Sequence, residues 1–175
     1  MLIQLMFIFF IFFIGSFIQG VSGFGFGMFA MSFLPFLFTV KDSALLVVSL
    51  SIILSGIIAI QLRKHIHWRS VIGILSWALI GRVIGYYILH NYGDLAILKS
   101  ILGGVLIVFV IYLFLSKPPS PERQINKTWL PAILGLFAGF VGGIFAVSGP
   151  FFVFYYLLLF HNNKYTYSAN LQISF

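Results

Sequence analysis

The chain has 175 residues, of which 61% are hydrophobic, 19% are aromatic and only 7% are charged. Because roughly a quarter of the residues of a soluble domain are charged, this composition excludes a soluble protein and predicts an all-α integral membrane protein, a bundle of several membrane-spanning helices. The net charge is +7 without any cysteine, so disulfides and thiolate metal sites are excluded, and the scattered basic residues do not form a nucleic-acid-binding face.

Five apolar segments follow along the chain, and about 20 apolar residues suffice for one helical crossing. Three segments fit single spans: Ser43 to Leu62, Val71 to Leu89 and Leu95 to Leu115. The first segment, Met1 to Val40, and the last, Leu130 to Phe160, are too long for one crossing. The N-terminal run has no basic region before it and no small-residue cleavage site, so we expect a retained span and not a signal peptide.

Basic residues in the loops predict the orientation, because short cytoplasmic loops collect Lys and Arg. The loop from Arg63 to Arg69 and the Pro-rich segment 116–129 contain three basic residues each. We expect both to be cytoplasmic. The loop from His90 to Lys99 has one lysine and an aspartate, so we expect it outside. These assignments predict a multi-pass protein of the cell membrane, either a plasma membrane or a bacterial inner membrane.

The Pro-rich segment 116–129 cannot continue a helix and divides the chain into two units, 1–115 and 130–175. Both units open with a Gly-rich apolar stretch: GSFIQGVSGFGFGMFAMSFLPFLF begins at Gly15, and GLFAGFVGGIFAVSGPFFVFYYLLL begins at Gly135. The matching residues are Gly20 with Gly139, Gly23 with Gly142 and Pro35 with Pro150. The pattern predicts two related repeats, each opening with a broken helix. The alternative is that two Gly-rich segments align by composition alone.

On this reading the first repeat, 1–115, is a broken helix with three spans, and the second, 130–175, is only the start of a repeat. The chain is then a fragment of a longer protein, or it needs a second chain.

If each long segment crosses once, the first unit has four crossings and the units are parallel. If each is a hairpin, the first unit has five crossings and the units are inverted. Loop charge favours the parallel version, because the loop after Phe160 contains only Lys164, whereas the length of the first segment favours the hairpin.

A helix interrupted inside a membrane leaves backbone N–H and C=O groups unpaired, which costs several kcal/mol each in lipid. Half-helix N-termini present such N–H groups and a positive dipole end, which suit an anion. We therefore predict an anion site near the bilayer midplane. Its predicted residues are Gln19, Gly20, Ser22, Gly23, Gly25, Gly139, Gly142, Gly143 and Ser148, with helix breaks at Gly27, Pro35, Gly149 and Pro150. The alternative for the Gly-xxx-Gly pairs is ordinary helix packing.

The charged residues narrow the chemistry. The three carboxylates lie in predicted loops, so this chain has no intramembrane acid for sodium or protons. Arg82 falls near the middle of a predicted span, where its charge costs at least about 2.5 kcal/mol. We hypothesise that Arg82 supplies counter-charge to the anion. The alternatives are that it binds carbonyl groups of a broken helix, or that the span boundaries are misplaced.

Other motifs point away from catalysis and cofactors. His65 and His67 form a pair without a third ligand, so we expect no metal site, and there is no Ser/His/Asp or HExxH arrangement for an enzyme. The stretch GFGFG lacks the Gly-Lys-Ser/Thr of a phosphate-binding loop. We therefore expect a secondary transporter without a cofactor. Its expected partners are the lipid bilayer and a small anion, and a homo-oligomer is an open alternative to a single copy. The alternatives are a passive anion channel and a non-transporting membrane subunit.

The openings GSFIQGVSGFGFGMFAMSFLP and GLFAGFVGGIFAVSGP, together with LIGRVIGYYIL from Leu79 to Leu89, resemble the TauE/SafE family of sulfite exporters. The resemblance covers the whole chain but only about the first two thirds of a typical member. It implies export or uptake of small anions, with sulfite, sulfonates and related organosulfur compounds as the substrate class. Arg82 is not part of the family pattern, so the resemblance implies no role for it.

Overall fold

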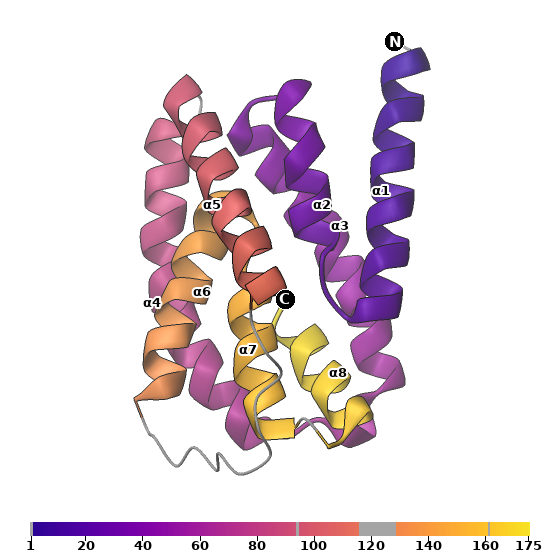
Figure 1. Cartoon of the computed structure of the whole chain (residues 1–175), viewed down its shortest axis with the longest axis vertical. Helices are drawn as coiled ribbons and strands as arrows, with labels where there is room; N and C mark the ends of the chain where they lie inside the picture. Colours follow the sequence, from indigo (N-terminus) through magenta and orange to yellow (C-terminus); the bar gives the residue numbers. More distant parts are fainter. Residues whose placement is uncertain (1, 94, 116–128, 161) are drawn as a thin grey trace.

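The computed structural model describes residues 2–93, 95–115, 129–160 and 162–175. All regular structure in these ranges is helical, which confirms the expected all-α class (Figure 1). The α-helices are α1 (Leu2–Ser22), α2 (Phe26–Phe33), α3 (Val40–Gln61), α4 (Trp68–Tyr92), α5 (Ala96–Leu115), α6 (Leu130–Phe145), α7 (Gly149–Phe160) and α8 (Lys164–Ile173), with short 3₁₀ turns η1 (Leu34–Phe36) and η2 (Arg63–His65).

Three of the described helices are long and apolar enough to cross a membrane, at Gln4–Ser22, Val40–Gln61 and Trp68–Tyr92. Helix α5 adds a further 20-residue apolar helix. The outer faces of these helices expose large apolar side chains, such as Phe9, Phe17, Ile53 and Val83. Such a surface is stable against lipid and not against water. The protein is therefore an integral membrane protein.

The first long segment is a helical hairpin. Helix α1 ends at Ser22, and α2 returns along it (Figure 1). The rings of Phe12 and Phe26 stack between the two helices, with their centroids 5.8 Å apart. The reversal uses Gly23 and Gly25, whose φ angles of 83° and 107° lie in the left-handed region that glycine adopts without strain. The hairpin therefore forms because the sequence supplies glycine at the two positions that need it.

The last long segment forms a second hairpin, which enters from the opposite end of the molecule (Figure 1). Helix α6 ends at Phe145, Ala146 takes a left-handed φ of 55°, and α7 begins at Gly149 and runs back. Helix α6 has a proline in its first turn, which suits a helix start because the missing N–H has no intrahelical partner there.

Helices α4 and α6 pack backbone to backbone through glycines from both helices. A Cβ atom at Gly81 would overlap the carbonyl oxygen of Leu136, and one at Gly139 would overlap that of Ala78. Small residues permit this approach, which is the usual basis of tight helix packing in membranes. The glycines of this interface are Gly81, Gly85, Gly135, Gly139 and Gly143.

The loop between α3 and α4 lies at the same end of the molecule as the start of α8. The backbone N–H of His67 donates to Oδ1 of Asn170 at 2.7 Å, and the rings of His65 and Tyr165 lie 5.5 Å apart. Lys164 therefore shares an end with the basic loop 63–69. The parallel arrangement, which placed Lys164 at the opposite end, is not the one seen. The long segments are hairpins, as their length indicated.

Candidate functional site

The two chain reversals meet inside the molecule and enclose a small cavity. Gly27, in the first turn of α2, lies directly against the carbonyl oxygen of Ala146, and Gly149, the first residue of α7, faces the ring of Phe24. The cavity has a volume of about 20 Å³, room for about one water molecule. Its walls are formed by Gln19, Gly25, Gly27, Met28, Ser51, Ala146, Val147, Ser148, Gly149 and Phe175.

Two helices begin at this cavity. The first helical hydrogen bond of α2 runs from the N–H of Phe29 to the carbonyl of Gly25 at 2.9 Å. The N–H groups of Phe26, Gly27 and Met28 precede that bond and have no partner within the helix. Helix α7 begins at Gly149, which also lines the cavity. Both helix starts contribute positive potential, which favours an anion between them.

Two serine hydroxyls line the cavity without a hydrogen-bond partner among the described residues. Ser148 is 5% exposed and precedes α7, and Ser51 lies on α3. Ser51 is half-buried, and neither hydroxyl is fully enclosed, because no fully enclosed side-chain oxygen or nitrogen of the described residues lacks a partner. These two groups are therefore available to a bound ligand.

A buried network of side-chain amides supports the first reversal. Nε2 of Gln19 donates to Oγ of Ser55 and to Oε1 of Gln172, both at 3.0 Å. Nε2 of Gln172 donates to the carbonyl of Gly23 at 2.8 Å. The network satisfies a backbone carbonyl that the helix break would otherwise leave unpaired, and it ties α8 to α1.

Five of the residues predicted for the anion site or the helix breaks line the cavity: Gln19, Gly25, Gly27, Ser148 and Gly149. Two others support it. Gly23 makes the reversal, and Gly142 packs against Cβ of Ser148, where an added Cβ would lie only 2.9 Å away.

The remaining predicted glycines and Ser22 lie elsewhere. Gly139 and Gly143 contact the backbone of α4, as the packing alternative described. Gly20 has no atom within 4 Å of an added Cβ, and Ser22 is exposed, with its hydroxyl donating to carbonyls of its own segment. These four residues do not line the cavity.

Arg82 lies near the middle of α4, so its position within a span does not come from a misplaced boundary. Its backbone packs against Gly139 and Gly143, and its side chain is half-buried. No described residue forms a hydrogen bond or an ion pair with its guanidinium. Arg82 does not line the cavity itself.

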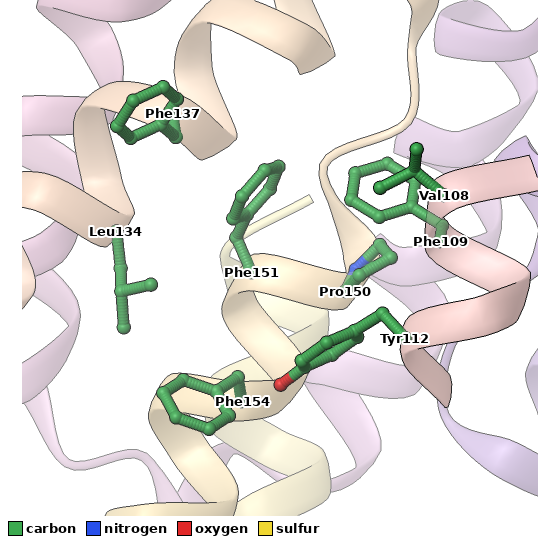
Figure 2. Close-up of a pocket in the computed structure, with 8 residues that line it drawn as sticks. All are labelled: Val108, Phe109, Tyr112, Leu134, Phe137, Pro150, Phe151 and Phe154. Atoms are coloured by element: carbon green, nitrogen blue, oxygen red, sulfur yellow. The ribbon is translucent and has the colours of Figure 1, made fainter. Parts of the chain in front are cut away.

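The two predicted prolines lie beside other hollows. Pro35, in η1, borders a cavity of about 260 Å³ between α2 and α5, and Pro150 borders an apolar groove of about 490 Å³. Figure 2 shows this groove between α5, α6 and α7, lined by Val108, Phe109, Tyr112, Leu134, Phe137, Pro150, Phe151 and Phe154. An anion would lose its hydration there without gaining partners, so the groove is no anion site.

Sequence reasoning missed Ser51, Ser55 and Gln172. A signal for them exists, because polar side chains within apolar membrane helices are costly and mark functional sites. Ser51 and Ser55 are four residues apart, which places both on one face of α3. Among the described residues, no three His, Asp or Glu side chains gather where they could hold a metal ion.

Comparison with known proteins identifies relatives. The sulfite exporter TauE/SafE family matches residues 7–175. A probable sulfite/organosulfonate exporter TauE from Cupriavidus necator is 31% identical over 146 residues, which cover 80% of this chain and 56% of that protein. The chain thus spans little more than half the length of this relative. No solved structure matches the present chain. The match over nearly the whole chain confirms the resemblance: the chain belongs to the sulfite exporter TauE/SafE family of membrane transporters.

Proposed function

We propose that the chain forms the substrate site of a secondary transporter for small sulfur oxyanions in the cell membrane. One observation carries the proposal: two helices from oppositely directed hairpins begin at one buried cavity, where the hydroxyls of Ser51 and Ser148 have no partner among the described residues. Helix starts and hydroxyls together supply donors for an oxyanion. The name of the relative from Cupriavidus necator, a probable sulfite/organosulfonate exporter, supports this substrate class.

The opposite entry of the two hairpins supports an alternating-access mechanism. We propose that units 1–115 and 130–175 are inverted repeats, as in many secondary transporters, where one repeat moves against the other around a fixed site. A cavity of about 20 Å³ holds only about one water molecule, so an anion needs a wider form of the site. Movement of α7 relative to α2 would widen it, because Gly149 of α7 and Gly27 of α2 both line it.

Arg82 is proposed as a source of counter-charge for the anion outside this closed cavity. Its side chain is half-buried and has no partner among the described residues, and its backbone lies against α6. A positive charge inside a low-dielectric span attracts anions over several ångströms. On this proposal the anion passes near Arg82 on its way to the site.

Transport by purified protein in liposomes tests the proposal through Ser51→Ala and Ser148→Ala. A hydrogen bond to a charged group contributes about 1.5–3 kcal/mol, so each variant should lower the apparent affinity for sulfite about tenfold or more. The matched control is Ser49→Ala, whose hydroxyl donates to the carbonyl of Leu45 on the exposed side of the same helix. Wild-type flux in both cavity variants would refute the site. Flux that never saturates with sulfite concentration would favour a channel.

A further inference from the structure

We infer that the site selects anions that carry a hydrogen-bond donor, and that Gln19 makes this selection through its side-chain oxygen. The inference rests on the proposed function, because it concerns the occupant of the same cavity. Its starting point is the backbone carbonyl of Gly23, where α1 gives way to the reversal.

The carbonyl of Gly23 determines which way the amide of Gln172 faces. The amide atom next to this carbonyl lies at 2.8 Å. A carbonyl oxygen can only accept, so this amide atom must be Nε2. The reversed amide would bring two oxygens together at that distance, beside a side chain that is 2% exposed. Gln172 therefore directs its Oε1 toward Gln19.

The orientation of Gln172 then determines that of Gln19. Oε1 of Gln172 lies 3.0 Å from the Gln19 amide, and only Nε2 can donate to it. The same Nε2 lies 3.0 Å from Oγ of Ser55, so both of its hydrogens are engaged. The oxygen Oε1 of Gln19 is left as an acceptor, and no described residue donates to it.

This oxygen faces the cavity. Gln19 is 3% exposed and forms part of the cavity wall. Among the described residues, no side-chain oxygen or nitrogen is both fully enclosed and without a partner. Because Oε1 has no partner in that part of the chain, it must border open space, and the cavity provides that space.

The cavity therefore combines donors with one fixed acceptor. The N–H groups at the starts of α2 and α7 and the two serine hydroxyls can bind anionic oxygens, whereas Oε1 of Gln19 repels them. A site built to bind a ligand O–H or N–H can reject an analogue without it by up to about 10⁴-fold, because its buried polar group stays unpaired.

The selected class is a monoanion with one O–H or N–H directed at Gln19. Among sulfur oxyanions, hydrogen sulfite carries such a donor, and so does a sulfonate with a hydroxyl or ammonium group close to the sulfur. The sulfite dianion and simple alkanesulfonates carry none. Gln19 is thus a specificity-determining residue, and Gln172 is the positioning residue that keeps its oxygen in the cavity.

Two probes of equal charge and similar shape test the inference. At mildly acidic pH, methylphosphonate is a monoanion with one P–O–H group, whereas methanesulfonate is a monoanion without any donor. Binding of each to the purified chain in lipid nanodiscs is measured by calorimetry. We expect methylphosphonate to bind at least tenfold more tightly. Equal affinities would overturn the inference and leave the proposed function intact, whereas binding of neither anion would overturn both.

Variants connect the selection to the amide network. Gln172→Leu releases the Gln19 amide to rotate, so the affinity ratio of the two probes should fall toward one. Ser76→Ala is the control, because this exposed hydroxyl of α4 donates only to the carbonyl of Gly73, and it should preserve the ratio. A folded Gln172→Leu chain with the full wild-type ratio would overturn the positioning role. If this variant fails to fold, the wild-type comparison decides the selection by itself.

Discussion

Gly27 and Ala146 touch where the two helical hairpins meet: a Cβ atom at Gly27 would overlap the carbonyl oxygen of Ala146. Gly27 lies in the first turn of α2, and Ala146 follows the last residue of α6 with a left-handed φ of 55°. Positive φ is uncommon for a residue other than glycine, and here it belongs to the residue whose carbonyl meets α2. The contact holds the start of α2 against the end of α6, and both residues line the cavity.

We predict that Gly27→Ala lowers the free energy of unfolding by about 1–3 kcal/mol, the usual cost of overpacking, and abolishes transport. The added methyl group meets a backbone oxygen, which cannot rotate away as a side chain can. Gly20→Ala is the matched control in α1, because no atom lies within 4 Å of its added Cβ, and alanine favours a helix over glycine by about 1 kcal/mol. Thermal unfolding in detergent compares the two, and equal midpoints would show that the hairpins do not touch at Gly27.

We also predict that Gly81→Ala and Gly139→Ala each separate α4 from α6. Both methyl groups would overlap a backbone carbonyl of the facing helix, so we expect a loss of at least about 1–3 kcal/mol and a lower yield of folded protein. Gly103→Ala in α5, where an added Cβ meets nothing within 4 Å, should not lower the midpoint, because alanine favours a helix over glycine. Size-exclusion profiles and melting curves provide the measurement. A normal midpoint for Gly139→Ala would contradict the packing role of this glycine.

The sequence could indicate the helix class, because apolar length and composition are local properties. Apolar length predicted α3, α4 and α5. The break predicted at Gly27 lies instead at Gly23 and Gly25, whose left-handed backbone makes the reversal, and Gly27 is part of α2. Helix α4 extends to Trp68 and Tyr92, about one turn beyond the predicted apolar segment at each end. Its interfacial aromatic residues continue the helix although they are less apolar.

The sequence could not separate glycines of the site from glycines of the packing interface. Gly27 and Gly139 both lie in Gly-xxx-Gly pairs, yet one lines the cavity and the other contacts α4. The distinction depends on which helix lies opposite, which is a property of the tertiary structure.

The pairing of Gln19 with Gln172 crosses 153 positions, and no local pattern links residues so far apart. The hairpin arrangement was one of two open alternatives, because a single lysine after Phe160 is weak information about orientation.

Asn170 is predicted to hold the loop between α3 and α4. Its Oδ1 accepts from the N–H of His67, and its Nδ2 donates to carbonyls of His65 and Thr166. Because Asn170→Ala removes three part-buried hydrogen bonds to these backbone groups, we expect a loss of about 1–3 kcal/mol and faster hydrogen exchange at the His67 amide. Asn91→Ala removes a side chain that donates only to Tyr87 of its own exposed helix face, so exchange at His67 should not change there. Unchanged exchange in Asn170→Ala would show that the loop is held by other contacts.

The orientation of the two hairpins predicts which positions share a side of the membrane. The chain has no cysteine, so single cysteines report their position without background. Lys64 and Lys164 are exposed at the end that carries the α3–α4 loop and the start of α8, and Tyr92 is exposed at the other end of α4. With the basic loops cytoplasmic, a membrane-impermeant maleimide added to intact cells should label Tyr92→Cys and neither Lys64→Cys nor Lys164→Cys. Permeabilised cells are the control, in which all three should react. Labelling of Lys164→Cys in intact cells together with Tyr92→Cys would place the second hairpin parallel to the first and would remove the opposed helix starts on which the anion site depends.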